Sequence, residues 1–296
     1  MRIFVIGASG YVGAAVARTL REAGHEVTGS ARHEDTVRKL REAGVEPVNG
    51  DVTAPESLAA AAHDADGVVY AVQYYGDDPA KVEGNALRAL VDALAGSNKP
   101  FAYTSGVWIY GNTGERIAAE DAPLDPTPLV AHRPQLERSV LDGVARGVRS
   151  FVIRPGDVYG AGGGIPAMWV QSARESGTVR FVGDGTNRWA MIHRDDLARL
   201  FALAIDGADP GAIYNAGDDT SFTVREMAEA ASEGAGKHGA VKAWPLEEAR
   251  AALGAFADAL VLDSRISSNR AREQLGWRTR TSTIVDDLRT GSYAGG

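Results

Sequence analysis

Three regularly spaced glycines are the first residues of this chain whose types suggest a chemistry. Gly7, Gly10 and Gly13 form the pattern G-x-x-G-x-x-G, directly after an apolar run at residues 3–6. In a strand–turn–helix unit such glycines let the backbone approach a pyrophosphate, and the helix N-terminus favours the anion. The pattern predicts a dinucleotide site, with an ordinary glycine-rich turn as the alternative. We expect the residues between the glycines to contact the cofactor as well: Ser9, Tyr11 and Val12.

The end of the second apolar run indicates which dinucleotide the site prefers. Proteins that bind NAD place an acidic residue at that point, where it bonds the ribose 2′-hydroxyl. This sequence has Ser30 and Arg32 there, and Glu26 lies at the opposite end of the run. Because a guanidinium and a hydroxyl can both bond a 2′-phosphate, the sequence favours NADP(H) over NAD(H). The alternative is that Arg32 simply faces solvent.

Further cofactor contacts are expected where later apolar runs end. Asp51 follows the third run, where its carboxylate can accept a hydrogen bond from an adenine amine, cap the next turn, or do both. The remaining expected contacts lie at or just beyond the ends of such runs: Val52, Ala71, Val72, Gln73, Thr104, Arg154 and Pro155.

These residues need a scaffold that gathers strand ends, and the apolar pattern predicts one. Short apolar runs indicate strands at residues 3–6, 27–31, 45–49, 67–72, 101–104 and 150–154. Helical periodicity separates them, in a first helix that stops near Gly24 and in others at 34–43, 55–62, 80–95 and 134–146. Strands alternating with helices predict an α/β fold, a doubly wound Rossmann parallel sheet with a smaller C-terminal substrate lobe.

The regular alternation ends near Pro155, which divides the chain into two parts. We expect a dinucleotide-binding core at residues 1–155. Residues 156–296 should form mainly a substrate lobe, with helices near 195–206, 223–233 and 246–254 and with some segments returning to the core sheet.

Composition excludes several other classes of protein. The chain of 296 residues has no cysteine, which excludes disulfides, Cys-bound metal centres and a thiol nucleophile. Its formal net charge of −8 argues against nucleic-acid binding. No apolar stretch is long enough to cross a membrane and no leader segment is evident, which favours a cytoplasmic protein. The six histidines lack metal-ligand spacing, so no metal is expected.

Several motifs together resemble one family, the extended and atypical short-chain dehydrogenase/reductases, also called the NAD(P)-dependent epimerase/dehydratase family. The resemblance covers nearly the whole chain. It implies a Rossmann sheet with a C-terminal substrate lobe, and often dimers, so a homodimer is possible. It rests on these segments, in order: the glycine pattern, residues 50–52, 104–111, 154–160, 183–185, 193–198, and 262–263 with 275–277.

The resemblance also implies a catalytic pair that this chain lacks. Most of the family uses Tyr-x-x-x-Lys on the helix after the fifth strand, with tyrosine as acid/base and lysine lowering its pKa. None of the nine tyrosines has a lysine four residues later. If Glu137 is the family's glutamate beyond the lysine, Arg133 takes the lysine position and Leu129 the tyrosine position. Leu129 cannot transfer a proton.

Other side chains must then supply the proton chemistry. We expect Ser105 to bond a substrate oxygen, although it could equally end a strand and cap a turn. Arg133 can bond a ribose or phosphate, His132 can exchange a proton unless it is a solvent-facing loop histidine, and Tyr110 is a phenol near the cleft. Five aromatic residues are expected to contact substrate: Tyr74, Tyr75, Trp108, Tyr159 and Trp189. The alternative for Tyr74 and Tyr75 is a surface pair that packs the two lobes together.

The sequence therefore predicts an NADP(H)-dependent oxidoreductase acting on a small carbonyl or imine compound. Two alternatives stay open. One is a redox-neutral epimerase or dehydratase on a nucleotide sugar, and the other is a catalytically altered NADP(H)-binding sensor protein.

Overall fold

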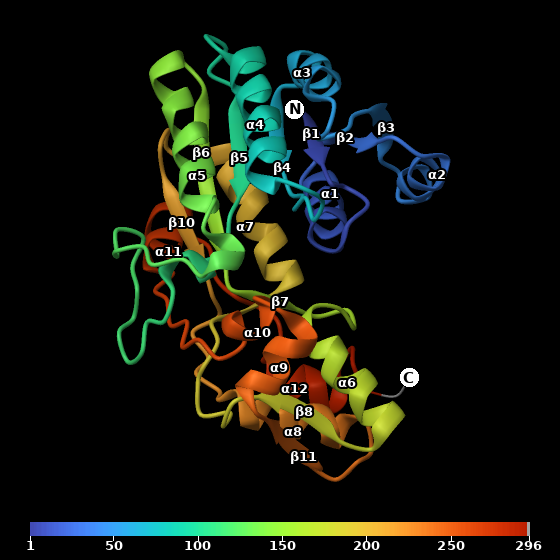
Figure 1. Cartoon of the computed structure of the whole chain (residues 1–296). Coiled ribbons are helices and arrows are strands. Elements are labelled where there is room, and N and C mark those ends of the chain that lie inside the picture. The colour runs from blue at the N-terminus through green and yellow to red at the C-terminus, as the bar shows by residue number, and fades with distance from the viewer. Residues whose placement is uncertain (295–296) are drawn as a thin grey trace.

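The central feature of the computed structural model is a seven-stranded parallel sheet (Figure 1). The structure describes residues 1–294. Strand order across the sheet is β10-β6-β5-β4-β1-β2-β3, which confirms the predicted doubly wound Rossmann arrangement. The strands of this sheet are β1 (Arg2–Ile6), β2 (Glu26–Ala31), β3 (Glu46–Asn49), β4 (Gly67–Tyr70), β5 (Pro100–Thr104), β6 (Arg149–Pro155) and β10 (Ile213–Ala216).

Helices cover both faces of the sheet because its strands are apolar on both sides. One face carries α1 (Tyr11–Glu22), α2 (Glu34–Glu42), α7 (Arg194–Gly207) and α11 (Asn269–Leu275). The other carries α3 (Pro55–Asp64), α4 (Pro79–Leu94) and α5 (Arg133–Leu141).

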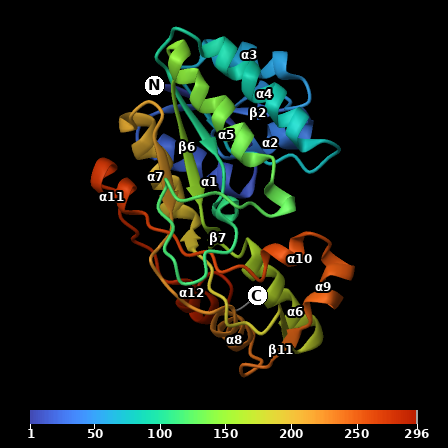
Figure 2. The same ribbon diagram turned by 60° about the vertical axis from the view of Figure 1, so that its left-hand side comes forward.

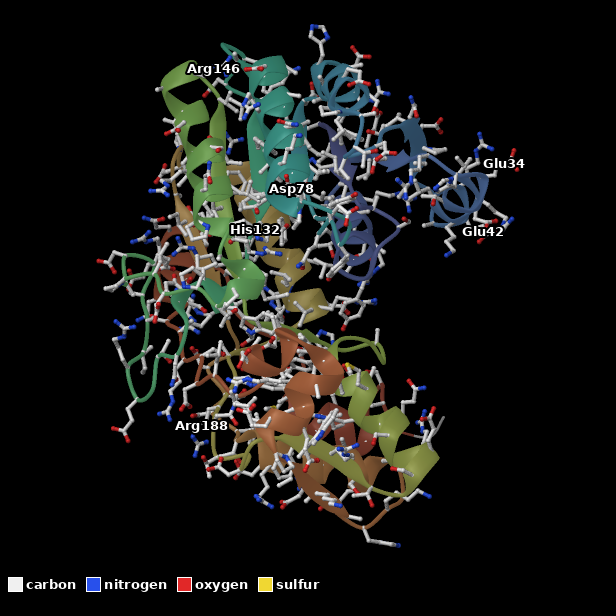
Figure 3. All side chains as sticks on the ribbon, in the orientation of Figure 1. Glu34, Glu42, Asp78, His132, Arg146 and Arg188 are labelled. Carbon is white, nitrogen blue, oxygen red and sulfur yellow. The ribbon has the colours of Figure 1, made fainter. Side chains whose placement is uncertain are left out.

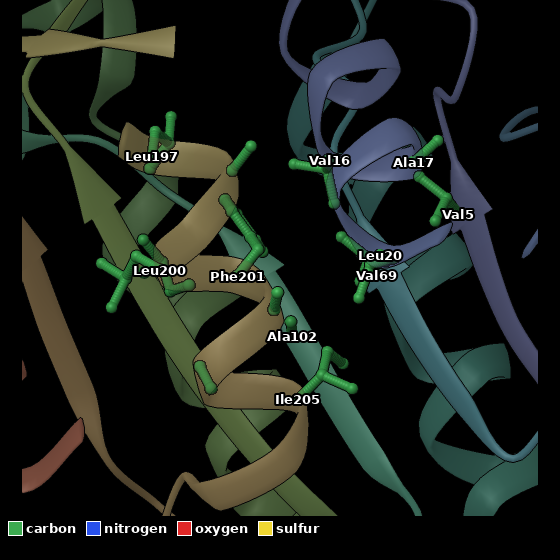
Figure 4. Packing of buried hydrophobic residues seen from close by; sticks show 14 of the residues in the cluster. Val5, Val16, Ala17, Leu20, Val69, Ala102, Leu197, Leu200, Phe201 and Ile205 are labelled. Carbon is green, nitrogen blue, oxygen red and sulfur yellow. The ribbon is translucent and has the colours of Figure 1, made fainter. Parts of the chain in front are cut away.

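Two helices far apart in sequence, α1 and α7, pack together on the first face. Figure 4 shows Val16 and Leu20 of α1 directed toward the region of the sheet that Leu200, Phe201 and Ile205 of α7 also fill. All five side chains are buried, and burying each one contributes roughly 1.5–3 kcal/mol. The second half of the chain therefore returns to the core sheet through α7 as well as β10.

The remaining elements form a lobe beyond the carboxyl ends of the strands (Figures 1 and 2). Its own core is rich in tryptophan and alanine. Two short strand pairs belong to this part of the chain, β7 (Asp157–Tyr159) with β9 (Met191–His193), and β8 (Val179–Val182) with β11 (Val241–Trp244). The lobe helices are α6 (Ile165–Ser176), α8 (Val224–Gly234), α9 (Leu246–Leu253), α10 (Phe256–Ala259) and α12 (Ile284–Thr290).

Several expected boundaries need correction. The helix expected at 134–146 ends at Leu141 and continues as a 3₁₀ helix over Asp142–Arg146. The strand expected at 67–72 ends at Tyr70, so the following residues form a loop beside the glycine turn. The sequence reading did not find α6, α10, α11 or α12. Among residues 1–294, no helix has the length and apolar character needed to cross a membrane.

Candidate functional site

The glycine turn between β1 and α1 is packed so tightly that a side chain would not fit at Gly7 or Gly13. Gly7 has φ +88°, and a Cβ there would lie 2.6 Å from the carbonyl oxygen of Ala71. A Cβ on Gly13 would overlap the carbonyl oxygen of Gly7. Gly10 caps α1 without a side-chain hydrogen bond, and it and Ser9 are exposed. The N-terminus of α1 therefore begins at an exposed part of the turn, an arrangement that fits a dinucleotide pyrophosphate.

Arg32 and Asp51, which the sequence assigned to separate cofactor contacts, lie together at the tip of β2. Arg32 Nη1 lies 3.2 Å from Asp51 Oδ2, and the Arg32 side chain is 55% exposed. Burial acts to raise the pKa of Asp51, but hydrogen bonds from Thr53 and contact with Arg32 lower it overall. Ser30 Oγ accepts a hydrogen bond from the Gly7 amide at 3.2 Å. These groups fit the ribose end of a dinucleotide, because most of the guanidinium donors of Arg32 stay free.

A cavity of about 280 Å³ extends from the glycine turn to the carboxyl ends of β4, β5 and β6. Eight of the residues selected from the sequence line it. They are Tyr11, Val12, Gln73, Tyr75, Ser105, Trp108, Arg133 and Pro155.

Arg133 forms part of the cavity wall from the first turn of α5. It is buried, and its Nη1 donates to the carbonyl oxygen of Thr104 at 3.5 Å. Its positive charge also acts on Glu83 of α4. Burial raises the pKa of Glu83, while a hydrogen bond from the Tyr74 amide and the charge of Arg133 oppose that rise. Arg133 therefore places a fixed positive charge beside Ser105, where an anionic or carbonyl oxygen can bind.

Tyr110 and Arg154 lie outside this cavity, in a buried network. Tyr110 Oη donates to Asn215 Oδ1 at 2.8 Å and accepts from Arg154 Nη1 at 2.6 Å. Arg154 also forms a two-pronged ion pair with Glu137. All four side chains are buried. Their contacts argue against the catalytic role expected for Tyr110 and the cofactor contact expected for Arg154, because neither side chain has a free face.

Three other selected residues lie outside this cavity. Tyr159 is 1% exposed, and its hydroxyl bonds Asp218 and the carbonyl oxygen of Ser282. Trp189 stacks on Trp169 in the lobe, with ring centroids 5.3 Å apart. His132 lies at the start of α5 outside the cavity lining (Figure 3). Burial and then the charge of Arg133 lower the pKa of His132, which favours its neutral form.

Among the cavity residues that were not selected from the sequence, Asp157 is the one with a titratable side chain. Its side chain is 8% exposed and lines the cavity directly after β6. Burial raises the pKa of Asp157 to about 7, with Trp108 opposing part of the rise. Within residues 1–294 its Oδ2 has no hydrogen-bond partner, and the same holds for Ser105 Oγ and Thr104 Oγ1. A carboxylate directly after a predicted strand was the signal that could have identified it.

Comparison with known proteins agrees with this geometry. The chain is 31% identical to an uncharacterised protein of Schizosaccharomyces pombe, C2A9.02, over 99% of this chain and all of that one. It is 26% identical to a UDP-glucose 4-epimerase of Mycolicibacterium smegmatis, over 95% of each.

Solved structures show the same fold. A dTDP-glucose 4,6-dehydratase from Streptomyces venezuelae, a double mutant with NAD and DAU bound, superposes with a TM-score of 0.83 at 19% identity. The alignment covers 99% of this chain and 96% of that one. The model of the NAD dependent epimerase/dehydratase family matches residues 3–217. The glycine turn, the parallel sheet and this match together show that the chain belongs to the NAD dependent epimerase/dehydratase family, whose members bind a nicotinamide dinucleotide.

Proposed function

We propose that this protein is an NADP(H)-dependent oxidoreductase acting on a small, uncharged carbonyl or imine compound. The observation that carries the proposal is the cavity that joins the glycine turn to Ser105 and Arg133. Gln73, which follows β4, would help to hold a nicotinamide there, and Ser105 and Arg133 would hold the substrate. The cofactor supplies the hydride, and the chain binds, orients and exchanges the proton.

The preference for NADP(H) is supported by the tip of β2. No carboxylate stands at the end of this strand, and Arg32 is exposed there with one bond to Asp51. Its remaining donors can bond a 2′-phosphate, for which a guanidinium has matching geometry.

The lining of the lobe supports the proposal that the substrate is uncharged. A second cavity of about 190 Å³ is lined by Trp169, Trp189 and Trp244, and it shares Ile165 with the first cavity. Such aromatic walls favour an apolar ligand over a diphosphate. The cytoplasmic location and the homodimer expected from the sequence stay predictions.

A redox-neutral epimerase or dehydratase acting on a nucleotide sugar is the second candidate. It is favoured by the relative whose name is UDP-glucose 4-epimerase. Against it stands the missing Tyr-x-x-x-Lys pair: if Glu137 is the family's glutamate, Leu129 takes the tyrosine position, and leucine cannot exchange a proton.

A single-turnover assay separates the two candidates. The protein is mixed with NADPH and a panel of ketones, aldehydes and imines, and the loss of reduced-nicotinamide absorbance is followed. In parallel, UDP-glucose and dTDP-glucose are incubated with protein and NAD and analysed for isomerised or dehydrated product. Oxidation of NADPH by a panel compound supports the first candidate. Conversion of a nucleotide sugar without such oxidation supports the second.

A further inference from the structure

Asp157 is held in a fixed position at the junction of β6 and β7. Its amide donates to the carbonyl oxygen of Ala190 at 2.7 Å. The preceding Gly156 packs so closely on Ala190 that a Cβ would overlap that same oxygen. Asp157 lines the same cavity as Ser105 and Arg133.

The carboxyl group of Asp157 is incompletely satisfied in this position. Trp108 lies close enough to favour its charged form, but Oδ2 has no hydrogen-bond partner within the part of the chain that the structure describes. Leaving a buried acceptor without a partner costs about 1–3 kcal/mol. A ligand that donates a hydrogen bond to this oxygen would remove that cost, and protonation would remove the buried negative charge. Ser105 Oγ is also buried without a hydrogen-bond partner among residues 1–294.

None of the charged groups named here forms an ion pair with the Asp157 carboxyl, so this carboxyl can exchange a proton. Arg133 of α5 lines the same cavity, whereas Arg154 of β6 is neutralised by Glu137. From β9, His193 packs edge-on against Tyr159. Burial is the main cause that raises the pKa of Asp157 to about 7. Both protonation states are then populated near neutral pH, as an acid/base group requires.

Two of the phenols near the cavity, Tyr11 and Tyr110, are less suited to this role. Tyr11 lines it, but its hydroxyl donates to the carbonyl oxygen of Gly160 at 2.7 Å, and burial raises its pKa. Tyr110 is held by Asn215 and Arg154.

We propose that Asp157 is the proton-transferring residue of this site, and that Ser105 hydrogen-bonds the same substrate oxygen. This inference rests on the proposed function. The carbonyl carbon accepts the hydride that a reduced nicotinamide supplies, and the C=O π electron pair moves to oxygen. That oxygen takes the carboxylic proton of Asp157 as its O–H bond breaks. The products are the alcohol, the oxidised nicotinamide and the Asp157 carboxylate, which regains a proton from solvent.

The first test needs no turnover. Infrared difference spectra of the full-length protein are recorded across the pH range, and the carboxylic C=O band is compared between wild type and Asp157→Asn. We expect a band that titrates near 7 in the wild type and is missing in the variant. A wild type without such a band would falsify the inference, because its carboxyl would then be ionised throughout the neutral range.

The second test uses the pH profile of single-turnover NADPH oxidation with an active panel compound. We expect the wild-type rate to fall about tenfold per pH unit above the Asp157 pKa. Asp157→Asn should lose roughly 10²–10⁴-fold in rate at acidic pH and lose that pH-dependent limb. The NADPH Kd of this variant, followed by cofactor fluorescence, should stay unchanged. If Asp157 had only a structural role, its replacement would lower both the rate and the affinity for NADPH.

The two proposals fail in different ways. If the wild type oxidises NADPH with a panel compound and Asp157→Asn keeps the same rate and pH profile, the inference is overturned while the proposed function stands. If the wild type oxidises NADPH with no carbonyl or imine, the proposed function is overturned, and the proton-transfer step with it.

Discussion

The guanidinium of Arg154 donates two hydrogen bonds to the carboxylate of Glu137, from Nε to Oε1 at 2.9 Å and from Nη2 to Oε2 at 2.6 Å. Both side chains are 3% exposed. The pair ties β6 to α5, and Glu137 lies four residues beyond Arg133, on the same helix face. The pair therefore fixes the face of α5 that presents Arg133 to the cavity.

Replacing Glu137 by Ala should destabilise the protein strongly. The change leaves the Arg154 guanidinium buried without a counter-charge, which costs about 3–5 kcal/mol in comparable buried pairs. Urea unfolding followed by circular dichroism measures the loss. Arg146→Ala is the control, since it breaks an exposed ion pair with Asp92 and should cost less than about 1 kcal/mol. Equal losses in the two variants would contradict the structural role of the Glu137 pair.

The sequence predicted the sheet well because its signals are local. The alternation of apolar runs and periodic helices, and the glycines at 7, 10 and 13, depend only on neighbouring residues. Strand ends also indicated Gln73, Ser105 and Pro155, which do line the cavity. The lobe was harder, because helices such as α6 and α12 begin amid glycine-rich or polar segments and are stabilised by tertiary packing.

Strand ends could not show which way a side chain points. Tyr110, Tyr159 and Arg154 all follow or end strands, yet each is turned into a buried network. Asp157 lies close to them in sequence and lines the cavity instead. Direction depends on the register of β7 against β9 and on close contacts such as that of Gly156 with Ala190, which link residues over 30 positions apart.

Gly13→Ala should abolish cofactor binding and lower stability. Its new Cβ would overlap the carbonyl oxygen of Gly7, so the turn must open and the amides of α1 must shift. NADPH titration by fluorescence and thermal unfolding measure the two effects. Gly84→Ala is the matched control in another helix, where the nearest atom, Leu136 Cδ2, would lie 3.6 Å away. That control should stabilise by about 0.5–1 kcal/mol and leave NADPH binding unchanged.

Arg32→Ala should weaken NADPH binding selectively. Loss of a charge-assisted bond to the 2′-phosphate costs about 1.5–3 kcal/mol, or roughly tenfold to a hundredfold in Kd. NADH lacks this phosphate, so its Kd should change by less than about threefold. Isothermal titration with both cofactors gives the comparison, and Arg146→Ala, an exposed arginine with one ion pair, should leave both affinities unchanged. Equal loss for NADPH and NADH would contradict the preference for NADP(H).

The buried carboxyl of Asp157 should make stability depend on pH in a defined direction. Its pKa is about 7 in the folded protein against 3.8 for a free side chain, so the folded state binds more protons between these values. Its contribution is therefore complete at low pH and is lost as the pH rises through about 7. At about 1.4 kcal/mol per pKa unit, the change is on the order of 4 kcal/mol.

Asp157→Asn isolates this contribution because an amide does not titrate in the window. Urea unfolding of wild type and variant between about pH 4 and about pH 8 gives the difference in unfolding free energy at each pH. The wild type should lose stability relative to the variant as pH rises, since every other titrating group is shared and cancels. A difference that stays constant across this range means that Asp157 titrates at its ordinary value, and that the cavity wall is more hydrated than its burial indicates.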